Sequence, residues 1–181
     1  MTPTNSQLLL ATIISFICFI TDIKYAKIFN KVTFPAMLLG LITAYSLFGV
    51  IGIKNSLYGL ITGIIIYFPL ALFGLVGMGD VKLLGAIGSI CGFYFIIKIF
   101  LLSSAIGFFH AIIIQIMNYG IKGIKLLLIS LKEKTFLKKT LTTENISLSK
   151  TGKYKFLIGI DIFIATIILS YLYAFTDISK T

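Results

Sequence analysis

The chain has 181 residues, of which 58% are hydrophobic and 12% are charged, and its mean hydropathy is +1.05. This composition excludes a disordered chain and an ordinary water-soluble domain, because a soluble fold of this size needs a largely polar surface. The formal net charge is +10, and every basic residue is a lysine. We expect no nucleic-acid binding, because the lysines flank apolar segments on the side of a membrane where the positive-inside rule places them.

The apolar segments in the first half of the chain predict three membrane-spanning helices. Residues 8–20 form the first, and because lysines follow this segment rather than precede it, we expect a true span and not a signal peptide. The second and third lie on either side of Lys54, between Lys31 and Asp80, in uncharged stretches of 22 and 25 residues. At about 1.5 Å per residue, each stretch can cross a hydrocarbon layer of roughly 30 Å.

The second half of the chain predicts three further spans and one long loop. Residues 80–118 exceed the length of one crossing, so we expect two helices with a turn around residues 88–94. Residues 119–155 hold nine lysines and no apolar run long enough to span, which predicts a basic cytoplasmic loop. The sixth helix should cover residues 156–175. The predicted fold class is all-α, a polytopic membrane protein with about six transmembrane helices in one domain, residues 1–181.

The lysines predict the orientation of these helices. Thirteen follow the first, third and fifth predicted helices, and three fall on the other side: Lys54, Lys98 and Lys180. Cytoplasmic loops carry the excess of basic residues, so the larger group should lie inside. We therefore expect a multi-pass protein of the cell inner (plasma) membrane. Its basic loop should lie on anionic lipid headgroups, or bind an acidic patch on a partner.

Three of the six acidic residues adjoin or interrupt apolar segments, namely Asp22, Asp80 and Asp161. An ionisable group at such depth is costly and is a functional candidate by default. Two predicted crossings separate Asp22 from Asp80, and an even number returns the chain to the same lysine-rich face. Two close carboxyl groups that share one proton can act as general acid and base on water, as an aspartic protease requires. The alternative is two unrelated acids at helix ends.

The sequence around these two acids resembles the signature of a protease family. Residues 77–83 are Gly-Met-Gly-Asp-Val-Lys-Leu, and Gly-x-Gly-Asp followed by x-Lys-Leu at a helix start resembles the type IV prepilin peptidases. These are membrane aspartic proteases of the GxGD type. Asp22 is followed by Ile-Phe-Asn at residues 28–30, which is similar to the first half of the family pattern. Phe29 departs from this pattern by replacing the usual proline, so the pattern does not fix the shape of this first inner loop.

The resemblance implies a GxGD aspartic protease bundle in which Asp22 and Asp80 are the catalytic residues. The residues that would support them or bind substrate are Gly77, Gly79, Lys82 and Asn30. The implied reaction is cleavage of the leader peptide of a type IV pilin-like precursor at the cytoplasmic membrane face, without a cofactor or a metal. The implied partners are the precursor, the lipid bilayer, and components of a pilus or secretion assembly. Methylating members carry an N-terminal domain with paired Cys-x-x-Cys motifs, so we expect cleavage without methyltransferase activity here.

Elementary electrostatics suggests how the two acids divide their roles. Asp80 should lie at the positive end of a helix close to Lys82, and Asp22 at the negative end of another. We therefore expect Asp80 to be the ionised base and Asp22 the protonated acid. Gly77 and Gly79 lack a Cβ, which permits strained backbone angles and the close approach of another chain. Asp161 should either pair with a polar group or lysine inside the bundle, or tune the pair as a third acid.

Two other classes of function remain open from the sequence. Intramembrane acids also serve as carriers in small ion- or proton-coupled transporters, although we find no internal repeat of the kind such proteins show. A non-catalytic subunit of a pilus or secretion apparatus is the other alternative. We expect no metal site, because His110 has no second ligand at a suitable spacing, and Cys18 and Cys91 lie far apart in apolar runs.

Overall fold

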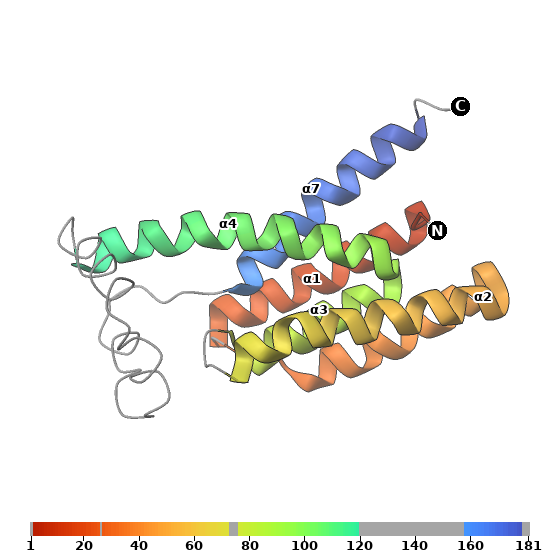
Figure 1. Cartoon of the computed structure of the whole chain (residues 1–181), viewed down its shortest axis with the longest axis horizontal. Helices are drawn as coiled ribbons and strands as arrows, with labels where there is room; N and C mark the ends of the chain where they lie inside the picture. The colour runs from red at the N-terminus through yellow and green to blue at the C-terminus, as the bar shows by residue number, and fades with distance from the viewer. Residues whose placement is uncertain (1, 26, 73–75, 120–157, 179–181) are drawn as a thin grey trace. The chain divides into compact units, whose positions relative to one another are not determined.

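A computed structural model of the chain describes residues 2–25, 27–72, 76–119 and 158–178. These residues form helices and no strand, which confirms the all-α fold class. The helices are α1 (Asn5–Tyr25), α2 (Asn30–Leu72), α3 (Met78–Cys91), α4 (Phe93–Tyr119) and α7 (Ile158–Ile178) (Figure 1). The chain divides into two compact units, one of residues 1–104 with 157–181 and one of residues 105–156. The predicted basic loop beyond Tyr119 lies outside the described residues, and the single-domain assignment stays a prediction.

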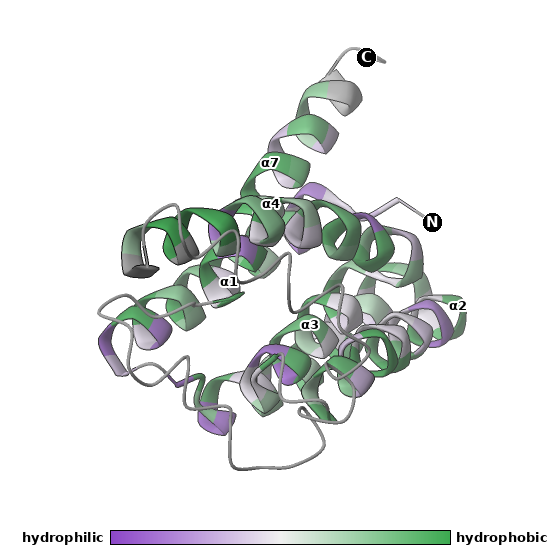
Figure 2. Cartoon of the chain, turned by 60° about the vertical axis from the view of Figure 1, so that its left-hand side comes forward, coloured by the Kyte–Doolittle hydropathy of each residue, from purple (hydrophilic) through white to green (hydrophobic). Residues whose placement is uncertain are grey.

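Four of the described helices are long and apolar enough to cross a membrane. They are α1, α2, residues 93–114 of α4 and residues 158–175 of α7. Large apolar side chains on these helices are exposed, for example Leu9 at 63% and Leu38 at 61%. Figure 2, coloured by the hydropathy of each residue, shows many hydrophobic residues along these helices. Apolar surface of this extent indicates lipid contact. The chain is therefore a membrane protein, while the expected number of about six spans is not confirmed.

The long helix α2 is interrupted at Gly49, which has a φ of 60° and a ψ of −143°. In one continuous helix, Gly40 and Gly59 would lie about 28 Å apart. Both nevertheless lie against residues 88–90 of α3, so the chain turns back at Gly49 (Figure 1). The second and third predicted helices are thus the two halves of α2. Their turn was predicted at Lys54 and lies at Gly49, because the reversal needs a positive φ that glycine adopts without a steric penalty.

Helix α3 is the buried centre of the first unit, and nearly all of its residues are shielded from the surface. It packs against both halves of α2 by backbone contact at glycines. A Cβ on either Gly59 or Gly88 would overlap the carbonyl oxygen of the other, and a Cβ on Gly63 would lie 2.6 Å from that of Leu84. Small residues at a helix contact allow such close packing in membranes. The position of α3 is therefore fixed closely by α2.

The ends of α3 and α7 complete the arrangement of this unit. Helix α3 ends at Cys91, the following Gly92 has a φ of 84°, and α4 begins at Phe93, which confirms the turn predicted at residues 88–94. Helix α7 runs antiparallel to α1. The hydroxyls of Thr12 and Ser170 lie 3.2 Å apart, and the rings of Phe19 and Phe163 stack with centroids 4.7 Å apart. The first turn of α7 therefore lies beside the last turn of α1, where Asp22 is located.

Candidate active site

Asp22 and Asp80 lie at the same end of the helix bundle, as the even number of crossings predicts. At the opposite end, the Cys91 thiol donates to the Gln7 carbonyl oxygen at 3.9 Å, which joins the last turn of α3 to the first turn of α1. The two helices therefore run antiparallel, and the last turn of α1 lies beside the first turn of α3. Both carboxyl groups are buried there, with Asp22 7% and Asp80 9% exposed.

The carboxyl group of Asp80 is held by the backbone just before it. The Gly77 N–H donates to Asp80 Oδ2 at 3.2 Å, so the side chain caps the start of α3. A Cβ on Gly77 would lie 2.9 Å from the same oxygen, so a larger residue would displace the carboxyl group. Asp80 Oδ1 is also buried, but no hydrogen bond from the described residues reaches it. Of the two carboxyl oxygens, Oδ1 is therefore the one whose hydrogen-bonding capacity is left for a bound molecule.

Burial and two neighbouring acids disfavour the ionised form of Asp80, which lies outside the four candidate spans. Burial raises the pKa of Asp80 to about 7, helped by the negative charge of Asp22 and, to a smaller extent, of Asp161, while the Gly77 N–H opposes the rise. The electrostatic effect of Asp22 on Asp80 links the two candidate catalytic acids directly. The raised pKa favours the protonated form of Asp80, whereas the helix dipole and Lys82 had suggested the ionised form. The division of roles between the two acids stays a prediction.

The remaining predicted site residues connect the start of α2 to the start of α3. The Lys82 amine donates to Asn30 Oδ1 at 2.9 Å and lies 5.5 Å from the centre of the Phe34 ring. The sequence predicts that Lys82 lies close to Asp80. In the structure, the amine of Lys82 donates to Asn30 instead. A Cβ on Gly79 would lie 2.9 Å from Ile28 Cβ, so this glycine admits the connection between α1 and α2. The glycine was expected to allow the close approach of another chain. In the structure, the segment that approaches it closely contains Ile28 of the same chain.

Strained angles were also expected at the two glycines of the motif. Gly77 has an ordinary extended conformation, with a φ of −73° and a ψ of 142°. Among the glycines in the described parts of the chain, positive φ occurs at Gly49 and Gly92. The space that a missing Cβ leaves, rather than backbone freedom, therefore explains the glycine at position 77.

Phe29, which replaces the usual proline, lies directly before the first residue of α2. Its carbonyl oxygen accepts from the N–H groups of Val32 at 3.0 Å and Thr33 at 3.3 Å, which closes the first turn of α2. Its ring meets that of Tyr25 edge to face, with centroids 5.5 Å apart. The carbonyl thus organises the helix start that carries Asn30.

Helix α7 contributes two residues to this end of the bundle. A Cβ on Gly159 would lie 2.5 Å from Asp22 Oδ2, so the backbone of α7 lies directly against the Asp22 carboxyl group. Asp161, in the first turn of the same helix, is 1% exposed and acts electrostatically on Asp80. This arrangement places a third acid near the pair, and both sequence alternatives for Asp161 stay predictions.

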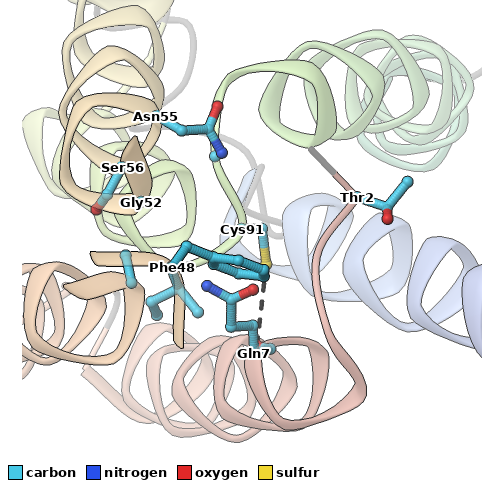
Figure 3. A pocket seen from close by; sticks show the side chains of 10 residues that line it. Thr2, Gln7, Phe48, Gly52, Asn55, Ser56 and Cys91 are labelled. Atoms are coloured by element: carbon cyan, nitrogen blue, oxygen red, sulfur yellow. Dashed lines mark hydrogen bonds between the residues drawn. The ribbon is translucent and has the colours of Figure 1, made fainter. Parts of the chain in front are cut away.

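A small polar cavity lies at the other end of α3, away from the acids. Its lining includes Gln7, Asn55, Ser56 and Cys91, and Figure 3 shows these side chains around the end of α3. The Ser56 hydroxyl donates to the Ser89 carbonyl oxygen, and the Phe93 N–H donates to Asn55 Oδ1 at 3.4 Å. These bonds fix the turn between α3 and α4. Because its polar groups are used in this way, we assign the cavity a structural role.

Comparison with known protein families decides the assignment. A model of the type IV leader peptidase family matches residues 9–112, which is more than half of the chain. The chain belongs to the type IV leader peptidase family. The suspected resemblance to prepilin peptidases is thereby confirmed. Neither a curated protein nor a solved structure matches this chain.

The segment that matches the leader peptidase family contains most of the residues singled out from the sequence. Asp22, Asn30 and the motif at residues 77–82 all lie within residues 9–112, whereas Gly159 and Asp161 lie beyond them. Sequence reasoning missed Gly159, because nothing in the sequence indicates a contact between residues 22 and 159. In the described part of this family member, no three His, Cys, Asp or Glu side chains gather where they could hold a metal ion.

Proposed function

We propose that this member of the leader peptidase family is an aspartic endopeptidase that removes the leader peptide from pilin-like precursors at the cytoplasmic membrane face. The observation that carries the proposal is the buried pair Asp22 and Asp80, contributed by α1 and α3 and coupled electrostatically. Such a pair with one proton supplies a general base and a general acid together. The family match favours this activity over a transporter or a non-catalytic subunit.

The proposed reaction uses the two acids in opposite protonation states. Asp22, as the carboxylate, takes a proton from water while the water oxygen bonds to the scissile carbonyl carbon. Asp80, as the acid, gives its proton to the carbonyl oxygen, which forms a neutral gem-diol. Asp22 then returns a proton to the leaving amine as the C–N bond breaks. Asp80 recovers its proton from the hydroxyl that becomes the carbonyl of the new carboxyl group.

Charge supports a cytoplasmic position for the acids. Lys24, Lys27 and Lys31 surround the connection after α1, and Lys82 follows Asp80, so the acid-bearing end of the bundle carries positive charge. The positive-inside rule places such an end in the cytoplasm of an inner membrane protein.

The proposed substrate is the precursor, and assembly components of a pilus or secretion system are proposed partners. Cys18 and Cys91 are separate buried thiols, so we propose cleavage without methylation.

The proposal is tested by co-expressing the protein with a pilin-like precursor and following the precursor's size on a gel. We expect the wild type to shorten the precursor, and Asp22→Asn and Asp80→Asn to leave it uncut, because each variant removes one proton carrier. Asp177→Asn is the matched control, since it makes the same change about 24 Å farther along α7 than Asp161. Cleavage by both active-site variants at the wild-type rate would refute the two-acid mechanism.

A further inference from the structure

A third buried carboxyl group lies at the acid-bearing end of the bundle. Asp161 is in the first turn of α7, and its side chain is 1% exposed. The antiparallel packing of α7 on α1 places Gly159, two residues earlier, against the Asp22 carboxyl group. Asp161 is therefore within one helical turn of the level of the Asp22 carboxyl group, at the end of the bundle that also holds Asp80.

The groups around Asp161 come from three other helices. Asp22 lies on α1 with the Cys18 thiol one turn away, Tyr67 lies on α2, and Asp80 lies on α3. Asp161 acts electrostatically on both Tyr67 and Asp80. On the part of α4 in the same unit, the Lys98 amine donates to the Tyr173 hydroxyl at 2.6 Å, three turns along α7 from Asp161. The described groups on which Asp161 acts electrostatically are thus a tyrosine and an acid.

We propose that Asp161 is a positioning residue of this peptidase, whose carboxyl group forms one titrating cluster with Asp22 and Asp80 and sets the pH range in which the pair holds a single proton. The effect of Asp161 on cleavage rests on the proposed function. The effect of Asp161 on the titration of Asp22 and Asp80 does not, because it can be measured on the folded chain without substrate. Asp161 lies outside the segment that matches the family, so the cluster extends the site beyond what that match covers.

The physical reason is repulsion between like charges in a buried site. An ionised Asp161 makes it harder for the Asp22 and Asp80 pair to lose its shared proton. Asp161→Asn removes the charge and keeps the shape, so the pair should lose that proton at a lower pH. Asp161→Glu keeps the charge and should leave the titration near that of the wild type. Thr166→Val is a matched control, because Thr166 is fully buried and its hydroxyl donates within α7 to the Ile162 carbonyl oxygen.

The first experiment measures the titration without any substrate. The full chain in phosphatidylglycerol vesicles is titrated by infrared spectroscopy, and the protonated-carboxyl band that Asp80→Asn removes is followed against pH. We expect its midpoint to fall by about one pH unit in Asp161→Asn and to stay in place in Asp161→Glu and Thr166→Val. Asp161→Ser repeats the test should the amide prevent folding. An unchanged midpoint in the neutral variants, or an equal fall in Asp161→Glu, would overturn the proposal.

The second experiment measures the pH dependence of cleavage for a synthetic peptide with a short basic leader and an apolar segment. We expect both limbs of the profile to move to lower pH in Asp161→Asn, because the pair loses its protons more easily once a neighbouring negative charge is removed. A shifted infrared midpoint with no cleavage by the wild type would refute the proposed function alone. Wild-type cleavage with an unshifted profile in Asp161→Asn would refute only the role of Asp161.

Discussion

Gly159 matters because it has no Cβ atom, and this allows its backbone to lie against the Asp22 carboxyl group. A glycine inside a helix costs about 1 kcal/mol relative to alanine, so alanine at such a position ordinarily stabilises the helix. Here the added Cβ would lie 2.5 Å from Asp22 Oδ2, closer than two such atoms can approach. Because α7 is also held to α1 by the stacked rings of Phe19 and Phe163, the carboxyl group has to move instead.

We expect Gly159→Ala to separate catalysis from stability. Displacement of the Asp22 carboxyl group should lower the cleavage rate at least tenfold, because small errors in the position of a catalytic group have large effects. The thermal unfolding midpoint in detergent should stay close to that of the wild type. Ile160→Ala changes the neighbouring residue without placing an atom near Asp22 and serves as the control. Normal cleavage by Gly159→Ala would show that the site tolerates this displacement.

At the scale of elements, the contact between α2 and α3 determines where Asp80 lies. Gly59 and Gly88 bring the two backbones together, and Gly85 lies nearby on α3. Gly88 and Gly85 differ in what a Cβ would meet. At Gly88 it meets the backbone of Gly59, which cannot yield locally, whereas at Gly85 it meets the flexible side chains of Ile64 at 2.9 Å and Met37 at 3.3 Å. The two positions on α3 therefore form a natural comparison.

We expect Gly88→Ala to be far more disruptive than Gly85→Ala. The first should lower the free energy of unfolding by about 1–3 kcal/mol, the usual cost of an overpacked interior, because the helices have to separate. The second should cost clearly less, because side chains can rearrange. Denaturant unfolding in mixed micelles measures both. Equal losses in the two variants would contradict a rigid backbone contact at Gly59 and Gly88.

For the whole molecule, the distribution of charge predicts which end faces the cytoplasm. Lys27 is exposed at the acid-bearing end, and Tyr94 is 63% exposed beyond the opposite end of α3. These two positions flank opposite ends of α3 and can therefore be used to test on which side of the membrane each end lies. Cys18 and Cys91 are buried and can be replaced to give a background without thiols.

In that background, we expect a membrane-impermeant maleimide to label Tyr94→Cys in spheroplasts from outside. Lys27→Cys should be labelled only after the membrane is permeabilised, because the positive-inside rule places its lysine-rich end in the cytoplasm. The reverse pattern would place the acids on the outer face and contradict cytoplasmic cleavage.

How far the sequence predicts this molecule depends on the range of each interaction. Asp22 and Asp80 are identifiable because an ionisable residue at an apolar boundary is visible in the local sequence. The turn in α2 was placed at Lys54 because charge suggested it, while the backbone reverses at Gly49, where hydropathy gives no signal. The contact of Gly159 with Asp22 and the burial that raises the pKa of Asp80 depend on the packing of helices distant in sequence.

The hydrogen bond from Gly77 to Asp80 makes the two oxygens of this carboxyl group chemically different. Oδ2 accepts the N–H, so a proton on that oxygen would weaken the bond that starts α3, whereas a proton on Oδ1 leaves it intact. The neutral acid therefore exists mainly as one of its two tautomers. A bound inhibitor should accordingly accept from Oδ1, and one that instead offers a donor to Oδ2 has to compete with the helix terminus.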